Sequence, residues 1–413
     1  MAKIYLDWAS TSPPLFSMQK ELQQSAHLFG NPSSIHTYGS EAEKALSDAR
    51  RLIGECTDAS PEEVIFTSGA TEANNMIAFS FLKKHLFSPA REERPQIIIS
   101  GIEHASLWEP AETLSKTGFD VFVAAADSSG IIQPKAVISL CTPRTVAVFC
   151  MLVNNETGAI QPVKEIVSAV KQWAAQHSTT IHVHTDAVQA FGKLWFSFRD
   201  LGADSAALSA HKTGGPKGVG ALLLKKKTAI DFLYCGGGQE NKRRPGTENL
   251  NAICFFARTA KKRITNLEDN LRKARSMMDM VITQLSRIDE VVLVPASRKP
   301  SLQSLYSPYI LSLAIVPVPS EVIVRSLDEH GIAVSAGSAC NLKSRKKQRR
   351  VLLAMNIDST TAESAIRISI GPETTVQELH SFTSTLQKIV PLHLHLAKRI
   401  RQPGKKSSSI RSK

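Results

Sequence analysis

A lysine followed by glycines is the first residue of this sequence whose setting suggests covalent chemistry. Lys212 stands in "SAHKTGGPKGVGALLL", directly after an apolar strand-like run, with Ser209 and His211 beside it. A lysine amine can form a Schiff base with an aldehyde cofactor, and small neighbours let a ring lie against the backbone. The alternative for this segment alone is a solvated lysine before a glycine-rich turn.

An aspartate follows another strand-like run. Asp186 comes directly after "TIHVH" in the segment "HTDAVQAFGK". There an ionised carboxylate can pair with a protonated pyridine nitrogen and keep such a ring an electron sink for a carbanion. Gln189, three residues on, can reach a ring hydroxyl. On its own, Asp186 is better explained as the cap of the following helix.

A turn of small residues joins a third strand to a helix in "FTSGATEANN". The backbone N–H groups of this turn, which includes Ala70, and the hydroxyl of Thr71 would point at an anion at the helix N-terminus. The pattern predicts a phosphate cup. Taken alone, helix starts rich in Ser and Thr are usually only caps.

Two more polar residues stand at strand ends. "SGIEHASLWEP" places His104 where an imidazole can stack on a cofactor ring and shuttle protons, and "VNNETGAIQPV" brings Asn155 to a similar position. Either alone is more often a structural polar residue. Together, four strand ends offer a phosphate cup, a stacking base, a ring-nitrogen partner and a Schiff-base lysine, which indicates a pyridoxal phosphate site.

The C-terminal part of the chain contributes a thiol and a guanidinium. Cys340 lies on a glycine-containing loop in "IAVSAGSACNLKS", where nearby bases favour the thiolate; the alternative is a free surface thiol. Arg367 stands inside the strand "AIRISIG", an expensive position for a guanidinium unless it meets a carboxylate. We expect a bidentate clamp on a substrate carboxylate, with a structural salt bridge as the alternative.

These side chains need a scaffold that brings distant strand ends together. From about residue 60 to 225, runs such as "QIIIS" and "VAVFCMLV" alternate with helical stretches, which predicts a mostly parallel sheet flanked by helices. Loops that leave the strand ends should carry the chemistry. The stretch 248–288 indicates a connecting helix, and the runs after it predict a smaller α/β domain. We expect the last dozen residues, "QPGKKSSSIRSK", to be disordered.

The composition favours a globular protein of the cytoplasm. A chain of 413 residues, 42% hydrophobic, can bury a large core, and its apolar runs are far shorter than the ~20 residues of a membrane span. Six bases in 343–350 and seven in 398–413 account for the net charge of +13, which argues for local basic appendages and against a nucleic-acid-binding fold. The six cysteines contain no CxxC pair, so neither a zinc site nor a disulfide scaffold is predicted.

Taken together, the motifs resemble one family. Over roughly residues 4 to 390, the chain is similar to the cysteine desulfurases of the NifS and IscS type, in the class V aminotransferase family. The resemblance implies a pyridoxal phosphate enzyme of fold type I that works as a homodimer. It has a large domain with a mostly parallel seven-stranded sheet and a smaller α/β C-terminal domain. The motifs that carry the resemblance are, in order, "GNPSSIHTYG", "TSGATEANN", "EHAS", "NNETGAIQPV", "HTDAVQAFGK", "SAHKTGGPKGVGALLL", "GGGQENKRRPGTEN" and "SAGSAC".

The resemblance also assigns roles at the cofactor ring. It gives Lys212 to the Schiff base, Asp186 to the pyridinium and Gln189 to the ring oxygen. His104 then stacks on the ring, and Asn155 lies at both the cofactor and the substrate.

The phosphate is held by a second group of residues in the family. Here they correspond to Ala70, Thr71, Ser209 and His211. Thr247 from "RPGTEN" would reach the phosphate of the partner subunit, which makes a monomer implausible as the active form.

We expect four parts along the chain. These are an N-terminal segment packed with the small domain, a large cofactor-binding domain, a small domain that carries the catalytic cysteine, and a basic, disordered tail. Their ranges are 1–14, 15–265, 266–396 and 397–413.

The implied reaction converts L-cysteine to L-alanine and leaves a persulfide on Cys340. Lys212 removes the Cα proton, His104 relays protons, and Asn155 and Arg367 hold the substrate. The sulfur then passes to an acceptor such as an iron–sulfur scaffold protein. Neither a membrane nor direct nucleic-acid binding is expected.

The sequence departs from the family pattern in two places. Trp8 in "YLDWASTSP" replaces a small or polar residue, and "NLKSRKKQRRVLLAMNI" after Cys340 is unusually basic and lacks the Glu-Pro often found there. The basic loop either docks an acidic scaffold or carrier protein or tRNA-linked machinery, or is a solvated mobile loop.

Three rival interpretations remain open at this point. A lyase or transaminase of the same fold shares Lys212 and does not need Cys340. A selenocysteine lyase keeps both residues. A non-catalytic sulfur-relay or nucleic-acid-binding protein needs the basic segments and no cofactor.

Overall fold

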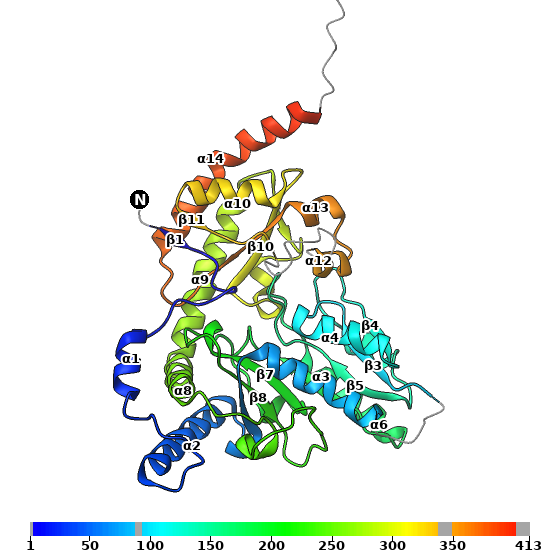
Figure 1. Ribbon diagram of the computed structural model, residues 1–413. Coiled ribbons are helices and arrows are strands. Elements are labelled where there is room, and N and C mark those ends of the chain that lie inside the picture. Colours follow the sequence, from blue (N-terminus) through cyan, green and yellow to red (C-terminus); the bar gives the residue numbers. More distant parts are fainter. Residues whose placement is uncertain (1–2, 87–92, 338–348, 402–413) are drawn as a thin grey trace, which may run out of the picture.

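The fold is built on a seven-stranded sheet, which occupies the lower half of the molecule in Figure 1. The computed structural model describes residues 3–86, 93–337 and 349–401. Within these residues the strands of the sheet follow the order β2-β8-β7-β6-β5-β3-β4. Their bounds are β2 Val64–Thr67, β3 Gln96–Ser100, β4 Asp120–Ala124, β5 Thr145–Phe149, β6 His182–Asp186, β7 Ser205–Ser209 and β8 Gly220–Leu224.

The sheet is mostly parallel, as the sequence predicts. The strands from β4 to β7 pair in parallel, while β8 runs antiparallel between β7 and β2. The carboxyl ends of β2, β3, β5, β6 and β7 therefore share one edge of the sheet. Ligands bind outside this edge in open α/β sheets. Sequence reasoning did not identify β4 or β8.

The central strands are buried on both faces of the sheet. In β3, Ile98 belongs to one hydrophobic cluster, whereas Ile97 and Ile99 belong to the cluster on the opposite side. This double burial explains why the strand reads as a continuous apolar run and does not alternate.

Helices cover both faces. Residues of α3 and α4 pack in the cluster that contains Ile97, and residues of α2, α6 and α8 pack in the cluster that contains Ile98. The helices that accompany this sheet are α1 Met18–Ser25, α2 Thr37–Thr57, α3 Ala70–Leu86, α4 Ala105–Lys116, α5 Pro134–Ile138, α6 Val163–Gln176, α7 Phe198–Leu201 and α8 Leu250–Thr265.

The connecting helix predicted for 248–288 is two helices in the structure. α8 ends at Thr265, and α9 runs from Leu267 to Leu285. Asn266 lies between them with φ −102° and ψ 13°, outside the helical range, so the chain bends there. The apolar periodicity continues through the bend, which is why the sequence pattern alone indicates one helix.

The C-terminal part forms a second, smaller sheet, drawn above the first in Figure 1. Its three strands pair antiparallel in the order β12-β10-β9, and β1 pairs in parallel with β11. The N-terminal segment thus packs on the C-terminal part, while the exact domain boundaries stay a prediction. The elements are β1 Ile4–Tyr5, β9 Val291–Val294, β10 Ile310–Ile315, β11 Ile332–Ala333, β12 Ala365–Ser369, α10 Ser320–Glu329, α12 Arg350–Ala354, α13 Ser359–Ser364 and α14 Val376–Arg401.

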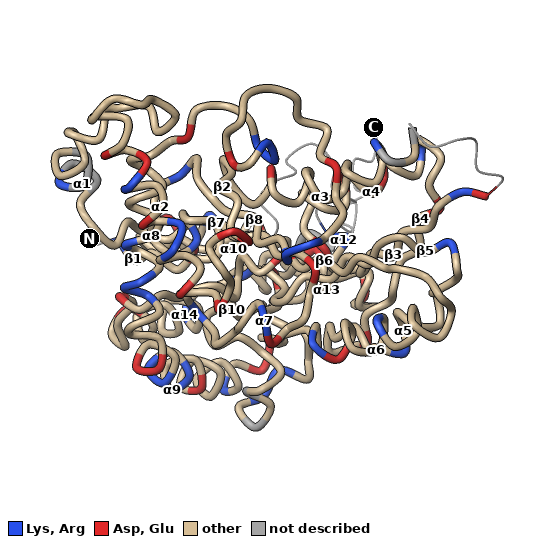
Figure 2. The backbone as a smooth tube through the Cα atoms, turned by 90° about the horizontal axis from the view of Figure 1, so that it is seen from below, with Lys and Arg blue, Asp and Glu red and all other residues tan. Residues whose placement is uncertain are grey.

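Acidic and basic residues are interspersed along the described chain (Figure 2). This mixing agrees with the balance of bases and acids that the sequence has outside its two basic segments. Among the helices of the described ranges, none combines the length and the apolar character that crossing a membrane requires.

Candidate active site

Five strands deliver the predicted site residues to one edge of the seven-stranded sheet. The edge is the one at which the carboxyl ends meet. Asp186 and Ser209 end β6 and β7, His211 and Lys212 follow in a 3-10 turn, and His104, Asn155 and the pair Ala70–Thr71 follow β3, β5 and β2.

Lys212 is held by backbone carbonyls of the N-terminal segment. Its Nζ donates to the carbonyl oxygens of Ala9 and Ser10, both at 2.7 Å. His211 beside it contacts the Thr11 hydroxyl through Nδ1 at 3.1 Å, and burial lowers the pKa of His211 to about 4. Residues 9–11 therefore form the wall that Lys212 faces.

Asp186 is buried and already accepts two hydrogen bonds. The N–H of Val188 donates to Oδ1 at 3.0 Å, and Nδ2 of Asn74 donates to Oδ2 at 2.9 Å. These contacts fix the carboxylate at the carboxyl end of β6. A carboxylate has about four lone-pair positions, so Asp186 can accept a further hydrogen bond from the N–H of a ring.

His104 caps helix α4 and faces the same region. Its Nδ1 lies 2.9 Å from Oγ of Ser106 and accepts from the N–H of Ser106 at 3.2 Å. Burial lowers the pKa of His104, while the carboxylate of Asp186 opposes that effect and Lys212 adds to it. The ring is thus electrostatically coupled to both residues that are expected at the cofactor.

The predicted phosphate cup lies where β2 turns into α3. Gly69 stands at φ +156° before the 17-residue helix that begins at Ala70, so the positive end of the helix dipole opens here. A Cβ on Gly220 would lie 2.8 Å from Cα of Gly69, so only glycine lets β8 approach the turn. Gly220 pairs with Ser209 on one side and with Thr67 on the other, so the end of β7 lies one strand away from the turn.

Thr247, expected to serve the phosphate of a partner subunit, lies close to this cup. It lines a cavity of about 240 Å³ together with Thr67 and Ser68 of the β2 end. The cavity extends to Arg244, which forms an ion pair with Glu72 at 2.9 Å.

Gln189 is joined to a buried lysine that sequence reasoning did not assign. Nε2 of Gln189 donates to the Ala9 carbonyl at 3.0 Å, and Nζ of Lys193 donates to its Oε1 at 2.8 Å. Burial lowers the pKa of Lys193 to about 7, with a further contribution from Lys212. The amide group of Gln189 is therefore fixed with its NH2 facing the N-terminal segment.

Arg367 lies on β12 and reaches across to the N-terminal segment. Its Nη2 donates to Oδ1 of Asp7 and to Oγ of Ser10, both at 2.8 Å, and Nη1 donates to the carbonyl of Asn155 at 2.8 Å. The side chain is 3% exposed, and its Nε has no hydrogen-bond partner in the described part of the chain. Buried N–H groups without an acceptor are uncommon, so this nitrogen is a candidate donor to a ligand.

Trp8, where the sequence departs from the family pattern, packs next to this region. A Cβ on Gly371 would lie 2.1 Å from Cε3 of Trp8, so the indole lies directly on the Gly371 backbone. The indole N–H donates to the carbonyl of Tyr5 at 3.1 Å. Trp8 thus fixes the N-terminal segment that contacts Lys212.

Cys340 and the bases from Lys343 to Lys347 lie outside the described residues. The last two bases of the run are described, and neither is part of a solvated loop. Arg349 is buried and donates to the carbonyl of Ala336 at 2.7 Å and to Oγ of Ser320 at 2.5 Å. The docking or solvated-loop interpretation is therefore wrong for this part of the basic run.

Arg350 is the second of these bases and anchors α12 to the large sheet. Its guanidinium lies 3.9 Å from the ring centroid of Trp108 and donates to the carbonyls of Gly101 and Glu103. It therefore joins the segment before His104 to the C-terminal part of the chain.

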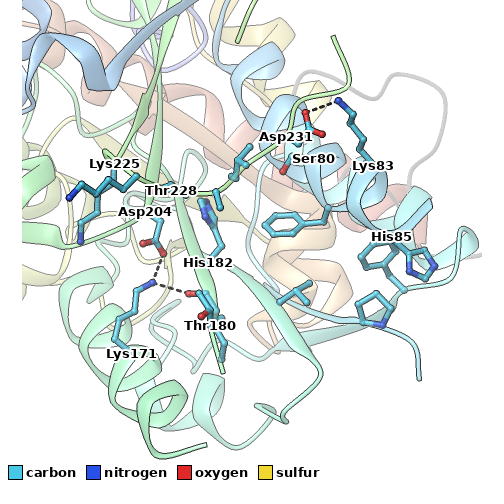
Figure 3. A pocket seen from close by; sticks show the side chains of 18 of the residues that line it. Ser80, Lys83, His85, Lys171, Thr180, His182, Asp204, Lys225, Thr228 and Asp231 are labelled. Carbon is cyan, nitrogen blue, oxygen red and sulfur yellow. Dashed lines mark hydrogen bonds and ion pairs between the residues drawn. The ribbon is translucent and has the colours of Figure 1, made fainter. Parts of the chain in front are cut away.

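A cavity of about 940 Å³ lies at the opposite edge of the sheet (Figure 3). His182, at the amino end of β6, lines it, whereas Asp186 ends the same strand at the other edge. Two ion pairs cross its wall, Lys83–Asp231 at 2.6 Å and Lys171–Asp204 at 2.5 Å. The predicted cofactor residues do not line this cavity.

Sequence reasoning missed residues that support the assigned ones. Asn74 and Lys193 stand inside motifs that the sequence analysis quotes, and Ser10 stands in the N-terminal segment. The signal for Asn74 and Lys193 is a polar side chain on an otherwise apolar, buried element. Ser10 carries no such signal, because its contacts with Lys212 and Arg367 lie hundreds of residues away along the chain.

The model of the aminotransferase class-V family matches residues 4–382 of this sequence. The chain belongs to the class V aminotransferase family. The match covers most of the described residues, including both sheets. It confirms the family that the motifs predict.

Known members with two different named activities are similar to this chain. A cysteine desulfurase IscS of Dictyoglomus turgidum is 33% identical, over 94% of both chains. A selenocysteine lyase of Xenopus tropicalis is 32% identical, also over 94% of both chains. The solved structure of a NifS-like protein superposes with a TM-score of 0.84 and 30% identity, over 94% of this chain and 100% of that one. These relatives confirm the predicted resemblance and fold.

The family implies the use of pyridoxal phosphate, and the residues present fit that cofactor. A buried carboxylate, a lysine held at a strand end and a glycine turn at a helix N-terminus lie on the same edge of the sheet. They match the pyridinium, the aldehyde and the phosphate in chemical character.

Proposed function

We propose that this protein is a cysteine desulfurase that uses pyridoxal phosphate to take sulfur from free L-cysteine. The contacts of Ser10 carry the proposal. The backbone carbonyl of Ser10 accepts from Nζ of Lys212, and its hydroxyl accepts from Nη2 of Arg367. The amine expected at the cofactor and the guanidinium expected at a carboxylate therefore contact the same residue, which brings close together the two groups that would hold the amine and carboxylate ends of an α-amino acid.

The cofactor would be held by residues of the sheet edge. Lys212 would carry it covalently, Asp186 would pair with its ring nitrogen, and the turn at Thr71 would take its phosphate. When bound, its protonated ring supplies an electron sink for the negative charge that develops at the substrate Cα. Gln189, fixed by Lys193, offers an NH2 group for the ring oxygen.

Arg367 would bind the substrate carboxylate. Its unpartnered Nε and a partly used Nη1 leave donors for an incoming anion, and burial makes such a contact strong. Asn155 lies next to Arg367, because its backbone carbonyl accepts a hydrogen bond from Nη1 of Arg367. The carboxylate would compete with Ser10 and Asp7 for Nη2.

Two residues would handle protons. Lys212, once its amine is free, is placed to take the Cα proton of the substrate. His104 has a lowered pKa, so its ring is neutral at pH 7 and can exchange a proton at Nε2. Nδ1 is already engaged by Ser106.

Cys340 would receive the sulfur, an assignment that rests on the motif "SAGSAC". The C–S bond of the substrate breaks as an S–S bond forms with the Cys340 thiolate. Cβ of the substrate then takes up one proton, Cα regains the proton that it lost, and the product leaves as L-alanine. The overall change, L-cysteine plus a thiol giving L-alanine plus a persulfide, needs no external oxidant or reductant.

The active form would be a homodimer, and the persulfide would pass to an acceptor protein such as an iron–sulfur scaffold. Thr247 supports the dimer, because it is exposed and lines the cavity that Thr67 and Ser68 at the end of β2 also line. The acceptor remains to be identified by capture of persulfide-linked partners.

The test is to incubate the purified dimer, loaded with cofactor, with L-cysteine and with L-selenocysteine in separate reactions. A desulfurase forms alanine from L-cysteine and gains one sulfur atom on the peptide that contains Cys340. Alanine formation from L-selenocysteine with none from L-cysteine identifies a selenocysteine lyase and contradicts the proposal.

A further inference from the structure

A chain of buried hydrogen bonds runs behind the predicted cofactor site and reaches residues that the proposed reaction does not use. Nε2 of His182 lies 2.7 Å from Oγ of Ser205, and the same Oγ lies 2.8 Å from Nδ1 of His184. Nε2 of His184 lies 2.9 Å from Oδ1 of Asn74. The side chains of Ser205, His184 and Asn74 are completely buried.

Asn74 divides this chain into two branches. Its Nδ2 donates to Oδ2 of Asp186 at 2.9 Å and to Oγ of Ser106 at 2.8 Å. Oγ of Ser106 in turn lies 2.9 Å from Nδ1 of His104. One amide group therefore contacts the carboxylate expected at the ring nitrogen and, through one hydroxyl, the imidazole expected on the ring.

The donors and acceptors of the chain have one consistent arrangement. An ionised Asp186 only accepts, so Asn74 turns its NH2 group toward it and its Oδ1 toward His184. Burial lowers the pKa of His184 to about 3, so its ring is neutral and its single proton sits on Nε2, facing Asn74. Nδ1 of His184 then accepts from Ser205, which accepts from Nε2 of His182.

The same reasoning fixes the proton on His104. The N–H of Ser106 donates to Nδ1, so this nitrogen is an acceptor and the proton of the neutral ring lies on Nε2. The charged groups that face the ring are Asp186 from β6, Lys212 after β7 and Arg350 from α12. Of these, only Asp186 favours a second proton.

We propose that Asn74 is a positioning residue that holds Asp186 and His104 in register with each other, and that the chain from His182 fixes the orientation of its amide. The inference rests on the proposed function only through the use of pyridoxal phosphate. Loss of the donor to Asp186 weakens the hold on the cofactor ring. Loss of the Ser106 hydroxyl removes a donor that favours the neutral form of His104, so the pKa of His104 rises.

Two variants separate the branches, and a neighbouring residue supplies the control. Asn74→Leu removes both donors at nearly constant volume, and Ser106→Ala removes only the His104 branch. Asn75 is the next residue on α3 and donates to the carbonyls of Thr71 at 2.8 Å and Ser106 at 3.2 Å. Asn75→Ala therefore changes the same helix without touching the side chains of Asp186 or His104.

The first measurement is the dissociation constant of pyridoxal phosphate, titrated into each cofactor-free dimer. In Asn74→Leu it rises by about tenfold or more, because a hydrogen bond to a charged group is lost. In Ser106→Ala and Asn75→Ala it stays within about twofold of the unaltered protein. An Asn74→Leu variant that binds the cofactor as tightly as the unaltered protein would overturn the proposal.

The second measurement is the ¹⁵N spectrum of the histidine rings in the cofactor-free protein, with His104 assigned from a His104→Gln variant. The unaltered protein shows the His104 proton on Nε2, and the pKa of His104 rises in Ser106→Ala but not in Asn75→Ala. A proton on Nδ1, or an unchanged pKa in Ser106→Ala, overturns the proposal even if Asn74→Leu does not fold. If both measurements succeed while L-cysteine is not consumed, the proposed function fails and the role of Asn74 stands.

Discussion

Nη2 of Arg367 lies 2.8 Å from Oδ1 of Asp7, an ion pair that joins residues 360 positions apart. The same Nη2 donates to Oγ of Ser10, so both protons of this nitrogen are used before any ligand arrives. A carboxylate that binds Arg367 in a bidentate manner must share or displace one of these partners. We therefore propose that the N-terminal segment forms part of the substrate site.

Arg367→Lys tests this relationship. An ammonium group can keep the ion pair with Asp7 but cannot also offer the planar fork that a carboxylate needs. We expect KM for L-cysteine to rise by about tenfold or more, because a charge-assisted hydrogen bond is lost, while cofactor content is retained. Steady-state kinetics with cofactor-saturated enzyme measure KM for L-cysteine. Unchanged kinetics would mean that the arginine is only structural.

Lys212→Ala tests the covalent attachment of the cofactor. Nζ of Lys212 lies at the carboxyl end of β7, held by the carbonyls of Ala9 and Ser10, so its removal leaves the sheet intact. We expect a folded dimer in which borohydride fixes no cofactor to the protein and alanine formation falls to background. Mass spectrometry after reduction measures this. Cofactor fixed to another residue would contradict the assignment.

The strand ends and their side chains were predictable because the sheet is buried on both faces. β3 stands out as an apolar run, and polar residues at or shortly after the ends of buried strands, Asp186 at the end of β6 and His104 four residues after β3, lie at the carboxyl edge. The parallel order then brings them together. β8 was not predicted, because the glycines of "GVGALLL" indicate a turn and because its antiparallel direction leaves no trace in composition.

The supporting contacts were not predictable, because they join segments that are distant in sequence. Ser10 meets Lys212 and Arg367 only after the N-terminal segment crosses between the two sheets. Because six bases cluster there, the sequence predicts that Arg349 and Arg350 belong to a basic loop. In the structure Arg349 is buried and donates to a backbone carbonyl, and the guanidinium of Arg350 stacks on Trp108. Charge clustering along the sequence does not reveal which guanidinium groups fold inward.

Gly371→Ala tests whether Trp8 fixes the N-terminal segment. The added Cβ would lie 2.1 Å from Cε3 of Trp8, whose side chain is buried, so the indole or the backbone must shift. We expect the free energy of unfolding to fall by roughly 1–3 kcal/mol, as for other overpacked cores, with weaker cofactor retention. Urea unfolding measures it. Gly238→Ala is the control, because a Cβ there meets nothing within 4 Å and should leave stability nearly unchanged.

The buried His182 should make stability depend on pH in a predictable direction. Burial lowers its pKa from 6.5 to about 4, so between these values the unfolded chain binds a proton that the folded protein does not. The stability that His182 contributes is complete above pH 6.5 and is lost as the pH falls toward 4. His182→Gln cannot titrate, so the unfolding free energy of the unaltered protein, relative to the variant, should fall by about 1.4 kcal/mol per pH unit.

The difference between the two proteins is the quantity to measure, because other groups oppose His182. Burial raises the pKa of Glu103 from 4.5 to about 7, which makes the folded state more stable as the pH falls through that range. Urea unfolding of both proteins at several pH values cancels this contribution. A difference that does not change with pH would show that His182 is protonated equally in the folded and unfolded states.

Cys340→Ala separates a desulfurase from other enzymes of the same fold. L-cysteine should still bind and change the absorbance of the cofactor, because Lys212, Asp186 and Arg367 are unaltered. Alanine formation should nevertheless collapse, since the C–S bond has no nucleophile to receive its sulfur. Cys235→Ala is the matched control, because Cys235 is an exposed free thiol and its loss should leave the rate unchanged.

After reaction with L-cysteine and alkylation, peptide masses should place one extra sulfur on Cys340. The mechanism is wrong if alanine forms at the normal rate without that thiol, or if the sulfur maps to Cys56 or Cys235.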